Sequence, residues 1–491
     1  MVRLERRKAV AAVASGVLAA LAMPGFGFAP LIFVSLVPLF YALDGRRRFL
    51  YGILFGATFL VLDLRWILTL YRFSPLVIPG FVLLVLYLAL FFGVGALLFL
   101  RRRSGPIGAE LLFVAPAVLT LIEIVRALGP LGTVFSSLFH ALYRIPWLIR
   151  GSSVLGPWSV TAVVVFVNAA FYLAVRQRQA RYLFTSAVAV AVLAGFVLLP
   201  SSPDGEPVRV AVVSSNVAQE VKLDGRNLSA LTDRYEDLGQ RALASNPDLV
   251  VFPESILPSF ILSDEEILAR FSDLARDGQT QILFGTGVYR DHKIYNTVAL
   301  LSREGEILGT YAMVRPVPFG EYVPGRRLWN AIGLKGLVDS FLPVDLTPGD
   351  GFTPLEGIGT PICFESTFPW PARALVQDGA ELLTVVTNDA WFAGSSELPT
   401  HFAAAVFRAV ENGRYVVQAA NGGFSGLINP EGRILAFTTD ETVAVGTVHM
   451  RDGQTLYARW GDAPLLLLLG IGVIGLLVVR IRKRMGKKSG E

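Results

Sequence analysis

Hydrophobic positions are distributed unevenly along the chain. Long, nearly unbroken apolar runs fill the first 200 positions and return once near the carboxyl terminus. A helix needs about 20 apolar residues to cross the hydrocarbon core of a bilayer. The pattern therefore predicts eight candidate membrane spans, at residues 8–24, 27–43, 49–71, 76–100, 108–127, 155–177, 182–199 and 464–480.

The middle of the chain has a different pattern, in which short apolar runs alternate with amphipathic stretches. The apolar runs predict strands at 207–214, 248–252, 281–288, 296–301, 359–364, 382–387 and 415–420. The amphipathic stretches predict helices at 228–245, 264–276, 369–378 and 399–413. Such alternation is typical of a sheet covered by helices. We therefore predict a membrane bundle of about seven helices at 1–200, an α/β catalytic domain at 201–455, and a last membrane helix with a basic tail at 456–491.

Composition and charge support a membrane protein with a defined orientation. The chain is 53% hydrophobic and 17% charged, with a mean hydropathy of +0.54. With eight spans, all the basic clusters fall on one side, and basic loops stay in the cytoplasm. The middle domain is then predicted to lie outside the cytoplasm. The clusters are Arg3, Arg6, Arg7 and Lys8; Arg46–Arg48; Arg101–Arg103; Arg176, Arg178 and Arg181; and Arg480, Arg482, Lys483, Arg484, Lys487 and Lys488. No basic stripe crosses the middle domain, so we expect no nucleic-acid partner.

Cys363 is the only cysteine of the chain, which excludes an internal disulfide and a multi-cysteine metal site. The histidines show no metal-ligand spacing, so we predict no metal and no cofactor. Cys363 ends an apolar run, and a helix is predicted soon after it. A helix N-terminus favours a thiolate, so we interpret Cys363 as a nucleophile. The alternative is a buried core cysteine, which behaves as a small hydrophobic residue.

Carboxylates stand close to other strand ends. Glu254 ends the run DLVVFPES and is either a cap or a general base whose pKa burial raises. Glu321 in VPFGEYVP and Glu365 in CFES are candidates for orienting catalytic groups, the alternative being ordinary loop carboxylates. In α/β sheets reactive groups collect beyond the strand ends. We therefore expect Glu254, Cys363 and the pair Asn388–Asp389 to lie close together.

The segment TNDAWF follows the predicted strand at 382–387. Asn388 and Asp389 could cap the next helix. Trp391 and Phe392 would then line a pocket or touch lipid.

Taken together, these segments resemble the apolipoprotein N-acyltransferase family of bacterial inner membranes, which is part of the nitrilase superfamily. The resemblance is carried by VVFPES, VPFGEYVP, PICFES, TNDAWF, HFAAAVFRAVENGRYVVQAANGG and INPEGRIL, by the layout of eight spans and by the loop Ile145–Pro146–Trp147. It implies a nitrilase-like αββα sandwich with a Glu-Lys-Cys triad. In that family the cysteine takes an acyl chain from a phospholipid as a thioester. The diacylglyceryl-cysteine at the N-terminus of an apolipoprotein then receives it.

Carried over to this chain, the resemblance implies roles for individual residues. Cys363 is the nucleophile, Glu254 the general base, and Glu321 and Glu365 are supporting acids. The residues expected to bind substrate are Trp391, Phe392, Asn388, Tyr322 and Trp147. The resemblance also implies that the protein spans the inner membrane with its catalytic domain on the extracytoplasmic side.

One position departs from the family pattern. The family has a lysine two residues after a tyrosine, and here Tyr311 is followed at that position by Met313. A thioether cannot stabilise a thiolate, and loss of one oxyanion donor costs on the order of 10²–10³ in rate. Arg315 could supply charge but cannot shuttle protons. Lys335 lies in a separate loop.

Three functions therefore stay open at this point. The first is acyl transfer to apolipoproteins, and the second is a membrane-anchored hydrolase or amidase in which water replaces the amine. The third is a weakened relative that binds lipid or lipoprotein without turnover. Met313 is the main reason to keep this third function open.

Overall fold

A computed structural model describes residues 2–99, 108–199 and 203–488. The chain forms two compact units. The helical unit comprises Met1–Leu128, Gly132–Pro200 and Trp460–Glu491, and the sandwich unit comprises Gly129–Leu131 and Ser201–Arg459. The predicted basic cluster Arg101–Arg103 lies outside the described residues.

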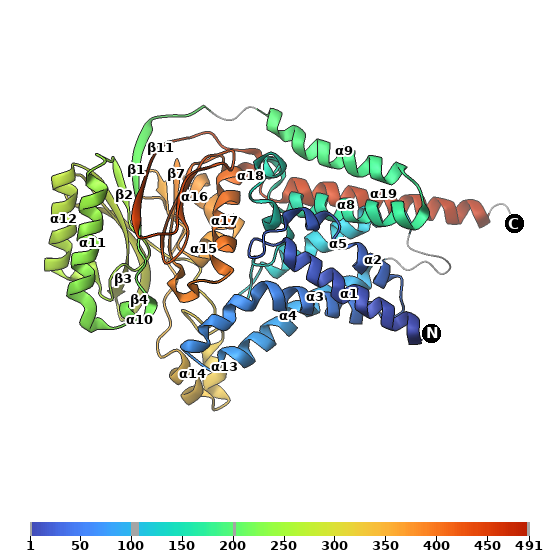
Figure 1. Cartoon of the computed structure of the whole chain (residues 1–491), viewed down its shortest axis with the longest axis horizontal. Coiled ribbons are helices and arrows are strands. Elements are labelled where there is room, and N and C mark those ends of the chain that lie inside the picture. Colours follow the sequence, from blue (N-terminus) through green and yellow to red (C-terminus); the bar gives the residue numbers. More distant parts are fainter. Residues whose placement is uncertain (1, 100–107, 200–202, 489–491) are drawn as a thin grey trace. The chain divides into compact units, whose positions relative to one another are not determined.

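The helical unit contains α-helices joined by short 3-10 turns (Figure 1). Among the residues that the structure describes, four helical stretches are long and apolar enough to cross a membrane: Arg48–Arg72, Val77–Leu98, Trp158–Gln177 and Arg181–Leu198. Ala29–Leu43 and Ala463–Leu476 are apolar but shorter. The elements are α1 Val2–Ala22, η1 Ala29–Phe33, α2 Val37–Leu43, α3 Arg48–Asp63, η2 Leu64–Arg72, α4 Val77–Leu98, α5 Leu111–Arg126, η3 Leu138–Leu142, α6 Pro146–Ile149, α7 Ser152–Leu155, α8 Trp158–Gln177, α9 Arg181–Gly195, η4 Phe196–Leu198 and α19 Ala463–Lys488.

Two of the predicted spans differ from the structure. The span predicted at 27–43 is not one helix, because a 3-10 turn at Ala29–Phe33 is separated from a short helix at Val37–Leu43. Both pieces begin next to a proline, which lacks an N–H and suits the first turn of a helix. The span predicted at 108–127 is reduced to the 16 residues of α5.

Charged residues inside the helical unit hold a loop rather than face lipid. Glu123 accepts hydrogen bonds from the backbone N–H of Leu138 and from Thr161, each at 2.7 Å. The Arg126 guanidinium donates to the Phe135 carbonyl at 2.8 Å. These charged groups are buried, so their contacts fix the loop that leads into η3.

The sandwich unit is built on two sheets. The first has the order β11-β1-β2-β3-β4-β5, with β1, β2 and β3 parallel and the other neighbours antiparallel. The second has the order β10-β9-β8-β7-β6, with β6, β7 and β8 parallel. The strands are β1 Pro207–Ser214, β2 Leu249–Val251, β3 Gln281–Arg290, β4 Lys293–Leu301, β5 Ile307–Ala312, β6 Ile358–Gly359, β7 Leu382–Asn388, β8 Val416–Asn421, β9 Ser425–Ile428, β10 Ile434–Thr438 and β11 Thr442–His449.

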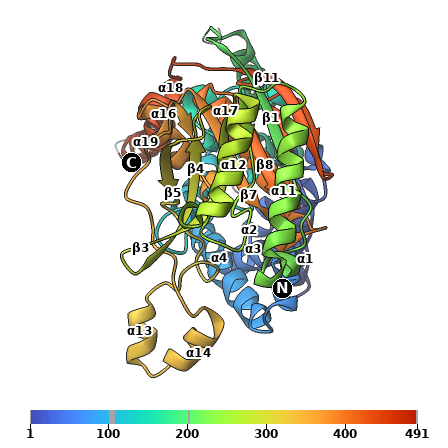
Figure 2. The same cartoon turned by 90° about the vertical axis from the view of Figure 1, so that its left-hand side faces the viewer.

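Helices cover the outer face of each sheet, so the unit has four layers in the order αββα (Figure 1). Helices α11 Leu228–Leu243 and α12 Glu265–Gly278 cover the first sheet, and α15–α17 cover the second. The predicted sandwich is therefore confirmed. In Figure 2, α13 and α14 lie on a loop that extends away from the two sheets. The remaining elements are α10 Gln219–Lys222, η5 Gly225–Asn227, η6 Ile261–Ser263, α13 Arg326–Ala331, α14 Lys335–Phe341, α15 Phe364–Thr367, α16 Pro369–Gln377, η7 Asp389–Phe392, α17 Glu397–Asn412 and α18 Leu456–Trp460.

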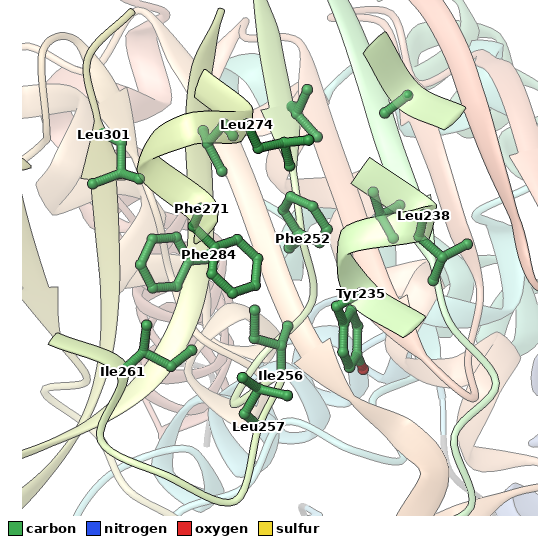
Figure 3. Close-up of a cluster of buried hydrophobic side chains, with 14 of the residues drawn as sticks. Tyr235, Leu238, Phe252, Ile256, Leu257, Ile261, Phe271, Leu274, Phe284 and Leu301 are labelled. Carbon is green, nitrogen blue, oxygen red and sulfur yellow. The ribbon is translucent and has the colours of Figure 1, made fainter. Parts of the chain in front are cut away.

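The core between the first sheet and its helices fixes the end of β2. Figure 3 shows Tyr235 and Phe271 from the helices beside Phe252 and Phe284 from the sheet. The ring centroids are 6.4 Å apart for Tyr235–Phe252 and 5.8 Å apart for Phe252–Phe271, within the range of favourable aromatic pairs. Phe252 lies two residues before Glu254. This packing therefore fixes the position of the segment that carries the Glu254 carboxylate.

The strand predicted at 359–364 is wrong for most of its length. Only Ile358–Gly359 forms a strand, and Ile362 makes an isolated bridge to Val386. Pro361 between them has no N–H to donate to a ladder. The chain therefore leaves regular pairing before it reaches Cys363.

Candidate active site

Cys363 lies in a strained turn at the edge of the second sheet. Its φ of 45° and ψ of −121° are unusual for a residue with a side chain, and such strain is common at functional positions. The turn is tied to the sheet because the Cys363 N–H donates to the Val386 carbonyl at 2.9 Å. The residue as a whole is partly exposed.

Glu254 lies beside this thiol and connects the two sheets. Its Oε1 accepts from the Asn296 side chain at 2.6 Å, and its Oε2 accepts from the Asn388 N–H at 2.8 Å. The Cys363 thiol lies near this carboxylate, because the hydroxyl of Thr387, the residue before Asn388, is 3.4 Å from the Cys363 Sγ. Burial raises the pKa of Glu254, and these hydrogen bonds and the charge of Lys222 oppose that rise. Glu254 is therefore buried among donors beside the thiol rather than at a helix cap.

Glu321 forms a second carboxylate beside the first. Its Oε1 accepts from the same Asn296 amide at 3.0 Å, and its Oε2 accepts from the Val317 N–H at 2.7 Å. Burial and the nearby charge of Glu254 raise the pKa of Glu321 to about 7. Two acids that accept from one amide disfavour double ionisation, so one of the two carboxyl groups is readily protonated near neutral pH.

Glu365 contacts the backbone on both sides of the site. It accepts from the Tyr311 hydroxyl at 2.7 Å and from the N–H groups of Val314, Arg315 and Ile362 at 2.9, 3.1 and 3.2 Å. Burial raises its pKa to about 7, although these donors oppose the rise. Glu365 therefore holds the segment after β5 against the Cys363 turn, which is a positioning role.

The resting thiol differs from the sequence-based expectation. Burial, together with the negative charges of Glu254 and Asp389, raises the pKa of Cys363 well above its usual value. The Thr387 hydroxyl, 3.4 Å from Sγ, opposes this effect. Cys363 is the N-cap of the four-residue helix α15, so the predicted helix start after the cysteine is present, and thiolate stabilisation by that N-terminus stays a prediction.

A buried charge cluster lies behind the Cys363 turn. His401 Nδ1 is 3.0 Å from Asp389 Oδ1 and 3.6 Å from Glu397 Oε1, and Nε2 is 3.1 Å from the Cys363 carbonyl. Burial lowers the pKa of His401, but the two carboxylates raise it more strongly, to about 9. The ligand atoms of the three side chains lie within 4.8 Å of one another, so these described residues could hold a metal ion. A protonated imidazole bound to two carboxylates accounts for the same geometry.

The predicted substrate-binding residues have different surroundings. Asn388 does not cap the next helix, because its Nδ2 donates to Gln219 and its Oδ1 accepts from Asn421. Trp391 and Phe392 follow it in η7 and are half-buried. Tyr322 donates to the Pro130 carbonyl at 2.9 Å within the sandwich unit. Trp147 lies in the helical unit with 49% of its surface exposed.

Several residues of the site were not recognised in the sequence. Asn296 is a polar residue inside the apolar strand β4, and this break in the pattern is a usable signal. Lys222 lies on α10, which follows β1, just as Glu254 follows β2. The expectation that reactive groups collect beyond strand ends could therefore also have identified Lys222. Thr387 and His401 lie within the segments that carry the family resemblance, but nothing in their local pattern indicates that they adjoin Cys363.

Comparisons with known proteins show which families this chain resembles. The carbon-nitrogen hydrolase family model matches residues 209–457, and the model of the apolipoprotein N-acyltransferase N-terminal domain matches residues 15–170. An amidase from Nesterenkonia sp. is 21% identical with a TM-score of 0.39, over 54% of this chain and 97% of that one. A carbon-nitrogen hydrolase from Helicobacter pylori G27 is 18% identical with a TM-score of 0.37, over 50% and 89%.

Relatives of known name match almost the whole chain. The apolipoprotein N-acyltransferase of Geobacter metallireducens is 33% identical over 97% of this chain and 96% of its own length. The enzyme of the same name from Thermotoga maritima is 32% identical over 97% and 95%. This chain therefore belongs to the apolipoprotein N-acyltransferase family.

Proposed function

We propose that this protein transfers an acyl chain from a phospholipid to the N-terminal diacylglyceryl-cysteine of apolipoproteins, through a thioester on Cys363. The observation that carries the proposal is the position of the buried Glu254 carboxylate next to the Cys363 turn. Glu254 accepts from the Asn388 N–H, and the hydroxyl of the neighbouring Thr387 lies 3.4 Å from the Cys363 sulfur. The family of the chain supports the acyl acceptor. The apolar helices support a membrane-resident acyl donor.

The first half-reaction forms the thioester. Glu254 accepts the proton of Cys363, and the sulfur attacks the carbonyl carbon of the lipid ester. The ester C–O bond then breaks, and the departing alcohol of the lysophospholipid takes the proton from Glu254. A covalent intermediate divides one transfer between two bulky lipids into two easier steps.

The second half-reaction releases the acyl chain. The amine of the apolipoprotein attacks the thioester carbonyl, the C–S bond breaks, and an amide forms. The proton lost by the amine passes through Glu254 to the sulfur, so the thiol is restored. Asn296 and Asn388 hold the Glu254 carboxylate in one position through both halves.

The proposed location follows from the charge pattern of the loops. The protein spans the bacterial inner membrane, and the sandwich unit lies on the extracytoplasmic side, where it meets the outer leaflet. Its proposed partners are the phospholipid donor and the apolipoprotein acceptor. Trp391, Phe392, Tyr322 and Trp147 are proposed to contact these substrates.

Intact-protein mass spectrometry tests the proposal. The purified full chain is incubated with phospholipid, and we expect a gain of one acyl group that Cys363→Ala abolishes and that a diacylglyceryl peptide discharges as an N-acylated product. Release of free fatty acid without an N-acylated peptide would identify a hydrolase. Lipid binding without any acyl adduct would identify a relative that lacks turnover, and either result would refute the proposal.

A further inference from the structure

The candidate site contains a group of buried acids that needs a balancing cation. Glu254 and Glu321 bind the same Asn296 amide, and Glu365 lies close enough for its charge to raise the pKa of Glu321. Buried carboxylates are costly unless an opposite charge compensates them. The charged form of Glu254, which is the form that can accept the thiol proton, therefore depends on a nearby positive group.

Met313 occupies a position from which a positively charged side chain could contact the buried acids. Its side chain is only 2% exposed, and its Sδ is 3.8 Å from the Asn296 Nδ2 that donates to both carboxylates. A thioether carries no charge and is a weak acceptor. The position beside the acid pair is therefore filled by an uncharged side chain.

Lys222 approaches Glu254 from another element. It is 5% exposed at the end of α10, and its Nζ donates to the main-chain carbonyl of Glu254 at 3.0 Å. The charges that act on it come from Glu254 and Cys363. Gln219, at the start of the same helix, accepts from Asn388, whose N–H binds Glu254. The helix that carries Lys222 is thus tied to the same network.

The other lysine side chains of the sandwich unit and Arg315 point elsewhere, and His401 behind the Cys363 turn is paired with Asp389 and Glu397. Lys293 is exposed, and Lys335 is 69% exposed and paired with Asp339. The Arg315 guanidinium lies 4.0 Å from the centre of the Phe368 ring and donates to the Gly129 carbonyl. Among the lysines of residues 203–455, Lys222 is the buried one.

We infer that Lys222 supplies the positive charge that keeps Glu254 ionised beside Cys363, in place of the lysine that Met313 replaces. When the thiol proton moves to Glu254, the negative charge moves to the sulfur, and the pair keeps a total charge of −1. An ammonium near both groups balances that charge before and after the transfer. Lys222 therefore acts as a positioning residue through Glu254.

The protonation behaviour of Lys222 fits this role. Burial lowers its pKa to about 8, while the charges of Glu254 and Cys363 oppose the decrease. The amine is therefore mostly protonated at neutral pH and loses its charge as the pH rises through about 8. Without that charge, Glu254 takes up a proton more readily and is less available as a base.

Alkylation of Cys363 by iodoacetamide tests the inference without requiring turnover. Since the chain contains one cysteine, the labelling rate of the full-length protein reports this thiol alone. Lys222→Met keeps most of the packing volume and removes the charge, and Lys293→Met is the exposed control. We expect Lys222→Met to slow labelling at pH 7.5 on the order of 10-fold and to displace the pH profile upward, and Lys293→Met to have no effect.

Rescue separates a charge effect from a packing effect. Met313→Lys introduces an ammonium beside Asn296, so in the Lys222→Met background it should restore most of the lost rate. Unchanged labelling in Lys222→Met, or slow labelling that Met313→Lys fails to restore, would overturn the inference.

The inference rests on the proposed base role of Glu254 in acyl transfer, and the two can fail separately. Failure to form an acyl adduct in the unmodified protein refutes the proposed function. The pH profile of alkylation then still reports whether Lys222 supports the Glu254–Cys363 pair.

Discussion

Gly285 controls the position of Glu254 through direct backbone contact. A Cβ added at Gly285 would lie 2.5 Å from both the Glu254 Cα and the Ser255 N, and 2.8 Å from the Pro253 carbonyl oxygen. All three are backbone atoms, so no side-chain rotation can relieve the overlap. We therefore expect Gly285→Ala to push the turn that carries Glu254 away from β3.

The size of the effect follows from these contacts. Carbon atoms pack at about 3.5–4.0 Å, so the turn must move by about 1 Å to accommodate the new methyl group. The Glu254 hydrogen bonds to Asn296 and Asn388, now 2.6 and 2.8 Å long, would lose their geometry. Misplacement of this size costs on the order of 10²-fold in rate. The overpacking itself should cost about 1–3 kcal/mol of stability.

A matched control lies on the same strand. At Gly287 an added Cβ would meet only ring atoms of Phe260, at 3.0 Å, and that ring lies at the end of a side chain that can adjust. Labelling of Cys363 by iodoacetamide and acyl-adduct formation would be measured for Gly285→Ala and Gly287→Ala, along with thermal unfolding in detergent. Equal rates for the two variants would refute the argument that β3 sets the position of the base.

Two further predictions concern the groups that hold the Cys363 turn. Glu365→Gln replaces one acceptor oxygen with an amide donor facing buried donors, so we expect a loss of about 2–4 kcal/mol in stability and a lower melting temperature, with Glu304→Gln on the surface as an unaffected control. His401 has its pKa raised from 6.5 to about 9, so its charge stabilises the fold by at most about 3 kcal/mol below pH 6.5 and this contribution is lost as the pH rises through about 9. His401→Asn should therefore remove the decrease in melting temperature over that interval, and an unchanged pH dependence would contradict the prediction.

The sequence predicts those parts of the sandwich that depend on local patterns. Pro207–Ser214 is rich in valine and forms β1 with the predicted bounds. Leu228–Leu243 is amphipathic and forms α11. β10 and β11 were not predicted, because their residues are mostly half-exposed and lack a continuous apolar run. β11 pairs with β1 from more than 200 positions away, and no local pattern reports such a partner.

The candidate site likewise contains residues that local sequence patterns identify and others that they do not. Glu254 could be identified because it follows the predicted strand at 248–252, and Cys363 because it ends an apolar run and a helix is predicted soon after it. The sequence could not predict that Glu254 and Glu321 both accept from the Asn296 amide. The two carboxylates lie in separate loops, which meet only after the sheets have formed. The Cys363 turn was also missed, because an apolar run was interpreted as a strand although it contains Pro361.

Met313 and Lys222 show that a sequence motif and the three-dimensional site need not place a charge on the same residue. A motif assigns a charge to a sequence position, whereas the chemistry needs a charge at a point in space. An ammonium near the Glu254–Cys363 pair can come from the position just after β5, where a lysine at 313 would stand, or from α10, where Lys222 stands. If the Met313→Lys rescue succeeds, the two routes are interchangeable, and the absence of the motif lysine does not by itself indicate an inactive enzyme.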